Sequence, residues 1–268
     1  MIGGGTISLV SMVSAARRLL GPLVVLGLTL GLAGCGSDDD KDGGVNIPDD
    51  ALERVVRQAI GKFEGPITAA DLEGITSLTT SSLGTMDLTG LEHATNLATL
   101  EFHHTQIDLS FLTRFPKLTR LRIEESRLSD IAPLAALTGL THLNLKRNEI
   151  GDISALASLT NLTTLNLRWN LISDISPLAG LTSLTELDLG RNEISDISPL
   201  AALTNLTELM LLQNQITDVS PLLENTGLSE GDSINLAQNQ FDEEAAGAAI
   251  KQLEERGVKV EFVRQHQY

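Results

Sequence analysis

Hydrophobic residues recur at a fixed spacing of 22 residues over residues 137–224. Within each unit leucines alternate with polar residues over a short run, as Leu165 and Leu167 alternate with Asn166 and Arg168. This alternation predicts a short strand with one buried and one exposed face. A unit of this size cannot bury its apolar face alone, so it must stack on its neighbours. The pattern therefore predicts a solenoid whose successive strands lie side by side and parallel, forming a curved sheet on the concave side.

Each unit carries an asparagine directly after its predicted strand. There the backbone leaves the sheet, and an inward-pointing amide can satisfy N–H and C=O groups that lose their sheet partners. We interpret these residues as structural and expect the loss of one to cost about 1 to 3 kcal/mol. Thr105 and Ser126 take this position in two earlier units, so the ladder is expected to be weaker there. The asparagines are Asn148, Asn170, Asn192, Asn214 and Asn239.

The return path of the units follows the pattern I-x-D-I-x-P-L. Its recurring proline excludes a continuous helix, and an aspartate before a short turn is well placed to cap free N–H groups of a 3₁₀ turn. A ladder of calcium sites is the alternative interpretation, but each unit offers only one carboxylate at this place, which favours capping. The prolines are Pro133, Pro177, Pro199 and Pro221, and the aspartates are Asp130, Asp152, Asp174, Asp196 and Asp218.

Residues 45–74 are predicted to form a helical N-terminal cap. Asp49 and Gly61 supply start and stop signals for a first helix, and the sequence TAAD at residues 68–71 predicts the capping box of a second. An open solenoid end would expose a row of leucines, so we interpret the two helices as a lid. The buried face of the first helix is expected to carry Leu52, Val55, Val56, Ala59 and Ile60.

Residues 75–227 are assigned to the repeats, and residues 228–268 to a C-terminal capping repeat and helix. The strand pattern occurs once more at Ile234 and Leu236. A helix is predicted over residues 243–256, ending at Gly257, followed by a last strand over residues 258–263. The buried face of this helix is expected to carry Ala246, Ile250 and Leu253.

The complete pattern, LxxLxxLxLxxNxIxDIxPL, resembles leucine-rich repeats. The 22-residue length and the DIsPL ending resemble the bacterial, internalin-like class, and IPDDALERVVRQAIGK resembles the internalin-type cap. The resemblance implies a right-handed α/β solenoid with a curved parallel β-sheet on its concave face and 3₁₀ turns and loops on its convex face. The earliest units depart from the pattern, since residues 75–93 fit it only at Leu78, Leu88 and Leu91.

Residues 1–34 have the pattern of an export signal. Arg17 and Arg18 precede an apolar run of about 16 residues, which is short of the ~20 needed to span a bilayer. The tetrad LAGC, ending at Cys35, resembles a bacterial lipobox, and this resemblance implies cleavage before Cys35 and acylation of that residue. An ordinary signal peptide or a retained membrane anchor is the alternative. Residues 35–44, rich in Gly and Asp, are expected to form a flexible tether.

Composition and the absence of motifs exclude several classes of function. The net charge of −16 becomes −18 without residues 1–34, since 17 basic and 35 acidic residues remain, and this argues against nucleic-acid binding. One cysteine excludes a framework of intrachain disulfides. No catalytic motif stands out, and His103, His104 and His142 do not converge on a predicted metal site. We therefore expect no enzyme activity and no cofactor.

The exposed strand positions form columns that run across the units, and one stretch of them is basic in an otherwise acidic protein. The only tryptophan stands beside this stripe, and Trp with Arg is the composition of interface hot spots. A surface whose variable positions simply drift is the alternative. The candidate partner-binding residues are His103, Arg120, Arg122, Glu124, His142, Lys146, Arg147, Arg168, Trp169, Arg191, Met210 and Leu212.

These features together predict a monomeric, non-enzymatic binding module of the bacterial cell envelope. It would be held at the membrane by lipid on Cys35 and would recognise a protein or an anionic glycan through its concave face, with adhesion to other cells as one role. Gly36 after Cys35 favours the outer membrane if the organism has one, and otherwise the outer face of the cytoplasmic membrane. The alternative is a structural or regulatory lipoprotein that binds a partner from the same cell.

Overall fold

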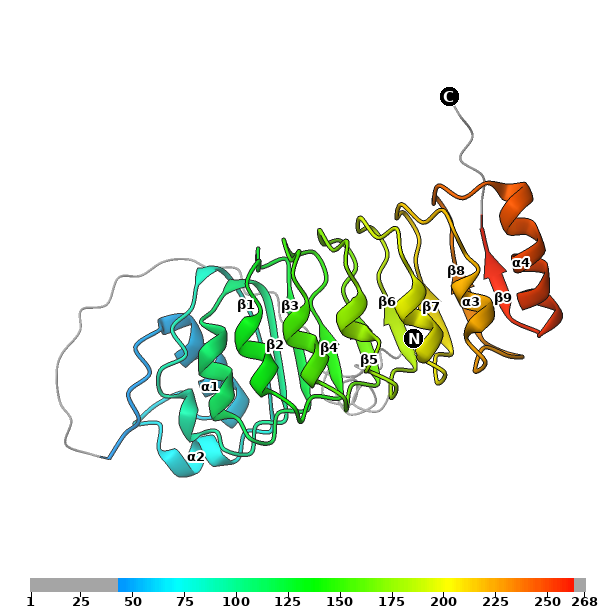
Figure 1. The fold of residues 1–268 in the computed structure, drawn as a ribbon. Helices are drawn as coiled ribbons and strands as arrows, with labels where there is room; N and C mark the ends of the chain where they lie inside the picture. The colour runs from blue at the N-terminus through cyan, green and yellow to red at the C-terminus, as the bar shows by residue number, and fades with distance from the viewer. Residues whose placement is uncertain (1–42, 263–268) are drawn as a thin grey trace, which may run out of the picture. The chain divides into compact units, whose positions relative to one another are not determined.

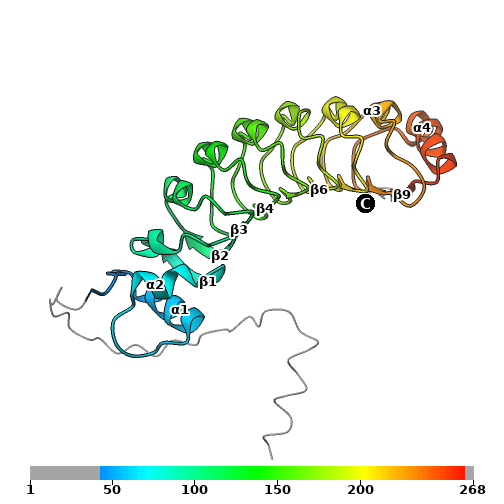
Figure 2. The ribbon, with the colours of Figure 1, turned by 90° about the horizontal axis from the view of Figure 1, so that it is seen from below.

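Nine parallel strands form one sheet in chain order in the computed structural model, which describes residues 43–262. The strands line the inner side of a curved solenoid, and short helical turns line its outer side (Figures 1 and 2). This confirms the predicted leucine-rich-repeat solenoid. The strands are β1 (Ser77–Thr85), β2 (Thr99–Gln106), β3 (Arg120–Glu124), β4 (His142–Asn144), β5 (Thr164–Asn166), β6 (Glu186–Asp188), β7 (Glu208–Met210), β8 (Ser233–Asn235) and β9 (Lys259–Glu261).

Outer turns complete each coil of the solenoid. They are mostly 3₁₀ helices, because each spans only a few residues and several have proline as their second residue, which fits the first turn of a helix but not its interior. The turns are η3 (Leu91–His93), η4 (Leu109–Arg114), η5 (Ala132–Ala136), η6 (Ser154–Ser158), η7 (Ser176–Leu178), η8 (Ser198–Ala202) and the α-helix α3 (Pro221–Glu224).

The core consists of aliphatic columns that run along the solenoid. Leu143, Leu165, Leu187 and Leu209 pair directly across β4 to β7, and each is at most 1% exposed. Because every strand contributes the same side chain at the same place, neighbouring units pack alike and need few aromatic rings. The sequence prediction of stacked aliphatic columns is confirmed.

The asparagine ladder has the predicted role. Asn170 donates from Nδ2 to the carbonyl oxygens of Leu145 at 3.1 Å and Leu167 at 2.9 Å, and its Oδ1 accepts from Ile150 N at 3.1 Å. One amide thus joins two successive units. In the earlier units the hydroxyls of Thr105 and Ser126 take this place. Each hydroxyl accepts one backbone N–H from the unit before it, whereas an amide can also donate twice.

The aspartates of the return path cap the outer turns, as predicted. Asp152, Asp174 and Asp218 each accept the backbone N–H two residues later at 2.8 Å, and Asp130 and Asp196 do the same at 2.9 and 2.8 Å. Hydrogen bonds from the backbone and side chain of Ser154, Ser176 and Ser220 lower the pKa of Asp152, Asp174 and Asp218 respectively.

These lowered pKa values predict that acid destabilises the solenoid. An aspartate whose folded pKa lies below its ordinary value of 3.8 stabilises the fold above that value, and the contribution is lost as the pH falls. Asp188 acts in the opposite direction, because burial raises its pKa. We expect the free energy of unfolding, measured with urea, to be lower at about pH 3 than at about pH 6. Changing Asp152, Asp174 and Asp218 to Asn should reduce the difference, and an equal free energy at both pH values would contradict the assignment.

The two ends of the sheet are covered by helices (Figure 1). Helix α1 (Asp50–Ile60) begins after Asp49, whose carboxylate accepts from Ala51 N and Leu52 N, and ends at Gly61, which has a φ of 69°. Helix α2 (Ala69–Glu73) begins with the predicted capping box. Leu52 and Val56 are buried, but Ala59 is exposed, so the prediction was wrong for this residue. The buried side of α1 is narrower than its apolar face.

The C-terminal end of the solenoid is also covered by a helix. Helix α4 (Glu243–Glu255) buries Ala246, Ile250 and Leu253 as predicted, and β9 pairs with β8. No helix within residues 43–262 is long and apolar enough to cross a membrane. The expected export segment and Cys35 lie outside the described residues.

Candidate binding surface

Two rows of side chains face outward from the inner sheet, because the strands pair in exact register. His142, Thr164, Glu186 and Glu208 stand side by side in one row. The second row contains Asn144, Asn166, Asp188 and Met210. Arg120 and Arg122 stand in the same rows on β3. The predicted surface columns therefore exist as continuous rows at a strand spacing of about 4.8 Å.

Glu124 is a centre of polar contacts rather than an exposed docking residue. It is only 9% exposed, it accepts from Arg122 Nη2 and Asn144 Nδ2 at 2.8 Å each, and His103 Nδ1 lies 3.6 Å from it. The expectation of an exposed Glu124 is therefore corrected, because three neighbouring polar side chains enclose the carboxylate. Its contacts also occupy Arg122 and His103.

His142 is half-buried on β4, with Nδ1 2.9 Å from the Thr141 hydroxyl. Burial lowers the pKa of His142, and the charge of Arg120 lowers it further. The imidazole is therefore kept neutral at physiological pH and can offer hydrogen bonds to a partner but no charge.

The residue before each ladder position forms a third row, which we call the turn row. All its members have a left-handed backbone with φ between 54° and 61°, which directs them outward where the chain turns off the strand. The sequence pattern placed Trp169 beside the basic stripe but did not predict this conformation, which is uncommon for residues other than glycine. The turn row consists of His104, Glu125, Arg147, Trp169, Arg191, Gln213 and Gln238.

Contacts along the turn row link successive units. Glu125 lies 2.8 Å from Arg147 Nη1 and 3.5 Å from His104 Nδ1, and the hydrogen bond from Arg147 lowers the pKa of Glu125. Trp169 lies between two guanidinium groups, with Arg147 Cζ at 5.7 Å and Arg191 Cζ at 3.9 Å from the ring centroid. These distances fit cation–π interactions, so the ring is held in place while 40% of the residue remains exposed.

Several cations of the predicted basic stripe make no direct ion pair, although the charges of Arg168 and Lys146 act to lower the pKa of Asp188. Arg120, Lys146, Arg168 and Arg191 make no ion pair within residues 43–262, whereas Arg122 and Arg147 do. The Nε atoms of Arg122, Arg168 and Arg191 are shielded from solvent and have no hydrogen-bond partner in the described part of the chain. A ligand carboxylate would therefore have to bind the Nη atoms of these guanidinium groups.

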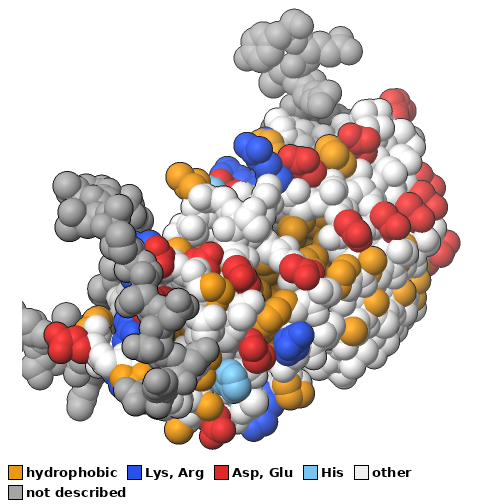
Figure 3. Space-filling model, turned by 90° about the vertical axis from the view of Figure 1, so that its left-hand side faces the viewer, with side chains coloured by type: hydrophobic (Ala, Val, Ile, Leu, Met, Phe, Trp, Pro, Cys, Tyr) orange, Lys and Arg blue, Asp and Glu red, His pale blue; other side chains and the backbone are white. Residues whose placement is uncertain are grey.

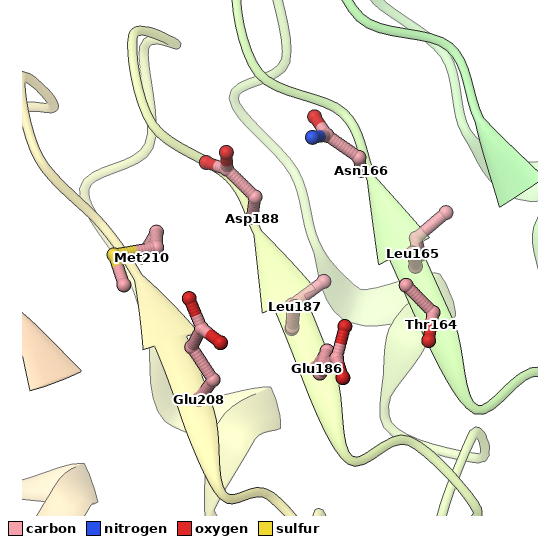
Figure 4. Close-up of a pocket in the computed structure, with 8 residues that line it drawn as sticks. All are labelled: Thr164, Leu165, Asn166, Glu186, Leu187, Asp188, Glu208 and Met210. Atoms are coloured by element: carbon pink, nitrogen blue, oxygen red, sulfur yellow. The ribbon is translucent and has the colours of Figure 1, made fainter. Parts of the chain in front are cut away.

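An acidic hollow of about 140 Å³ adjoins the stripe on β5 to β7. Figure 4 shows the carboxylates of Glu186, Asp188 and Glu208 around it, with Met210 at one side. Burial raises the pKa of Asp188, while a hydrogen bond from Gly190 N opposes that effect. Sequence reasoning singled out only Met210 here, although the three acids stood in the predicted rows. Leu212 lies against Gly190 of the neighbouring unit, where a Cβ would come within 2.5 Å of Leu212 Cδ2.

Charge is unevenly distributed over the surface. In Figure 3 acidic side chains gather along one side of the face shown, whereas Lys and Arg side chains lie elsewhere on it. The unpaired cations of the inner sheet therefore stand out against a surface that carries a large negative net charge.

Sequence comparison agrees with this architecture. Residues 116–172 match the family model described as leucine rich repeat, and residues 182–224 match the model for two copies of leucine-rich repeats. The fold and its repeated rows thus define a leucine-rich-repeat protein. No curated protein matches the chain significantly.

Two solved structures from Listeria monocytogenes strain 4b F2365 are similar over most of the chain. Internalin C2 is 35% identical with a TM-score of 0.70, covering 81% of this chain and 94% of that one. The internalin inlF is 29% identical with a TM-score of 0.66, covering 82% of this chain and 72% of that one. The chain belongs to the internalin family of leucine-rich-repeat proteins, which confirms the resemblance inferred from the repeat and the cap.

Proposed function

We propose that the chain is a non-enzymatic module that binds a protein partner through its inner sheet and turn row. The observation that carries this proposal is a set of cations on the inner sheet and turn row that make no ion pair within residues 43–262, together with a partly exposed tryptophan that Arg191 contacts. The cations are Arg120, Lys146, Arg168 and Arg191. An exposed Trp side chain is costly on a surface without a partner, and Trp and Arg are enriched at interface hot spots. Leucine-rich repeats commonly serve as scaffolds for binding proteins, which supports the same conclusion.

The proposal includes attachment to the bacterial cell envelope. The lipobox-like tetrad at Cys35 supports cleavage after residue 34 and acylation of Cys35, with residues 35–44 as a tether. Incorporation of labelled palmitate into the wild type but not into Cys35→Ser tests this step. Label on both proteins, or on neither, would contradict it.

The partner's origin separates two versions of the proposal. In the first the module binds a surface component of another cell, as in adhesion, and in the second it binds a component of its own envelope. The similarity to internalins favours a surface role. Capture with the full chain from extracts of foreign cells, compared with capture from the organism's own envelope, distinguishes the two, and binding of an anionic glycan would appear as capture that resists protease treatment.

Replacing Trp169 and Arg168 with alanine together should weaken partner capture by about tenfold or more. Both side chains are partly exposed, so the melting temperature should hardly change. Capture is compared at equal protein concentration with the wild type. The matched control is Arg114→Ala, since Arg114 also stacks on a ring, that of Phe111 at 5.0 Å, but belongs to the outer turn η4. Unchanged capture by the double variant would place the site elsewhere.

A further inference from the structure

Among the turns that follow β2 to β8, one exposes two large apolar side chains where the others expose polar ones. Trp169 in the turn row is 40% exposed, and Leu171, two residues later, is 54% exposed. Leu171 belongs to a second row, directly after the asparagine ladder. The other members of that row are all polar and exposed: Gln106, Arg127, Glu149, Glu193, Gln215 and Gln240.

The backbone fixes Leu171 in this row. Its N–H donates to Ile150 O at 2.9 Å, and Glu149 and Glu193 make the equivalent bonds to Leu128 O and Ile172 O at 2.8 and 2.9 Å. Leu171 therefore occupies the same backbone position as Glu149 and Glu193. The fold does not require an apolar side chain at this position. Burying such an exposed leucine against a partner removes apolar surface from water and so favours binding.

The cations near Trp169 and Leu171 differ in whether they already make an ion pair. Arg147 is bound to Glu125 at 2.8 Å. Arg191 has no ion pair within residues 43–262, and its guanidinium group lies over the Trp169 ring. Arg168, directly before Trp169, makes no ion pair in that part of the chain either. A carboxylate is the acceptor that fits guanidinium donors best.

We infer that the partner protein places a large apolar side chain against Trp169 and Leu171 and a neighbouring carboxylate against Arg191 or Arg168. This inference rests on the proposed function and moves the centre of the interface from the middle of the sheet to the turn edge of residues 159–180. The exposed glutamates Glu149 and Glu193 border the apolar pair and form a polar rim around it, as in protein interfaces.

A long polyanion fits the same surface poorly. Glu186, Asp188 and Glu208 line the hollow on β5 to β7, beside the strand that leads to Trp169, and adjacent strands are only about 4.8 Å apart. A sulfated or uronic-acid chain that reached Arg168 would bring its next charges towards these carboxylates. A single Asp or Glu in a protein segment avoids that repulsion, so the charge pattern favours a protein over an anionic glycan.

Panning of short random peptides displayed on phage against the full chain tests this inference. We expect enriched peptides to combine Asp or Glu with a large apolar residue. As free peptides they should alter the fluorescence of Trp169, the only tryptophan. Leu171→Glu, which installs the residue of both neighbouring units, and Arg191→Gln should each weaken binding by about tenfold, while Arg114→Gln should not change it.

The remaining outcomes have distinct meanings. Enriched peptides without an acid, peptides that bind Leu171→Glu as well as the wild type, or no enrichment at all would overturn the inference. A fluorescence change with heparin that exceeds the change with the peptides would also overturn it, in favour of a glycan. Peptides that lose binding only on Arg120→Gln would overturn the turn-edge site while leaving the proposed function of the inner sheet intact.

Discussion

Replacing Asn170 with alanine is expected to lower the free energy of unfolding by about 3 kcal/mol. The amide of Asn170 makes three hydrogen bonds in a buried place, to the carbonyl oxygens of Leu145 and Leu167 and from the N–H of Ile150. Alanine removes all three. The carbonyl oxygens of Leu145 and Leu167 keep a hydrogen bond from Asn148 and Asn192 respectively, but Ile150 N loses its acceptor in a buried place. Because the groups belong to two successive units, the loss should also weaken the coupling between them. Urea unfolding followed by circular dichroism measures both effects.

The matched control is Asn161→Ala. Asn161 is exposed and makes one hydrogen bond, to Thr138 O at 2.9 Å, so its loss should cost less than about 1 kcal/mol. A smaller dependence of the free energy on urea concentration in Asn170→Ala would show that the solenoid no longer unfolds as one unit. Equal urea midpoints for Asn170→Ala and the wild type would refute a structural role for the ladder.

The architecture was predictable because each structural rule acts within one repeat. Alternation at Leu165 and Leu167 indicates a strand, the proline excludes a helix on the return path, and the asparagine satisfies the turn between them. Stacking identical units then determines the sheet and its register without further information. Where the pattern fails, prediction fails with it. Strand β1 is nine residues long and its pairing with β2 shifts between Ser81 and Gly84, a detail that the atypical sequence of residues 75–93 did not reveal.

The binding surface was less predictable because its chemistry arises between units. Glu124 belongs to an exposed column by alternation, yet Arg122, Asn144 and His103 enclose it. Its burial depends on side chains from three strands. The left-handed backbone of the turn row likewise follows from the ladder geometry rather than from its side chains. Leu171 could have been found from the sequence by comparing the units position by position, since glutamate precedes and follows it in the neighbouring units.

Asn225 and Gly227, in the insertion before β8, show another feature that the sequence did not predict. Asn225 is fully buried and donates to Leu200 O and Leu203 O at 2.9 and 3.1 Å, while its Oδ1 accepts from Gly227 N at 2.9 Å. It therefore binds the backbone of the previous unit much as the ladder asparagines do, but from the outer turn. The repeat pattern does not cover this insertion, so the sequence did not predict the role of Asn225.

Replacing Gly227 with alanine is expected to destabilise the C-terminal units by about 3 kcal/mol. A Cβ on Gly227 would lie 1.8 Å from Thr204 O and 2.4 Å from Thr204 C, and backbone atoms of a packed unit cannot rotate away as a side chain can. The backbone around Gly227 would have to move, which would disturb the hydrogen bonds of Asn225 to Leu200 and Leu203. Urea unfolding gives the change in free energy, and amide hydrogen exchange should show the loss of protection concentrated around β7 and β8.

Two other glycines separate this clash from a general effect of removing glycine. Gly180 has no atom within 4 Å of its Cβ position, so Gly180→Ala should leave stability unchanged or raise it by about 0.5 kcal/mol by restricting the unfolded chain. At Gly190 the obstacle is the side chain of Leu212, which can rotate, so Gly190→Ala should have an intermediate cost. If Gly227→Ala were as stable as Gly180→Ala, the backbone around Gly227 would have to be free to shift. The inference that the insertion packs tightly against Thr204 would then be wrong.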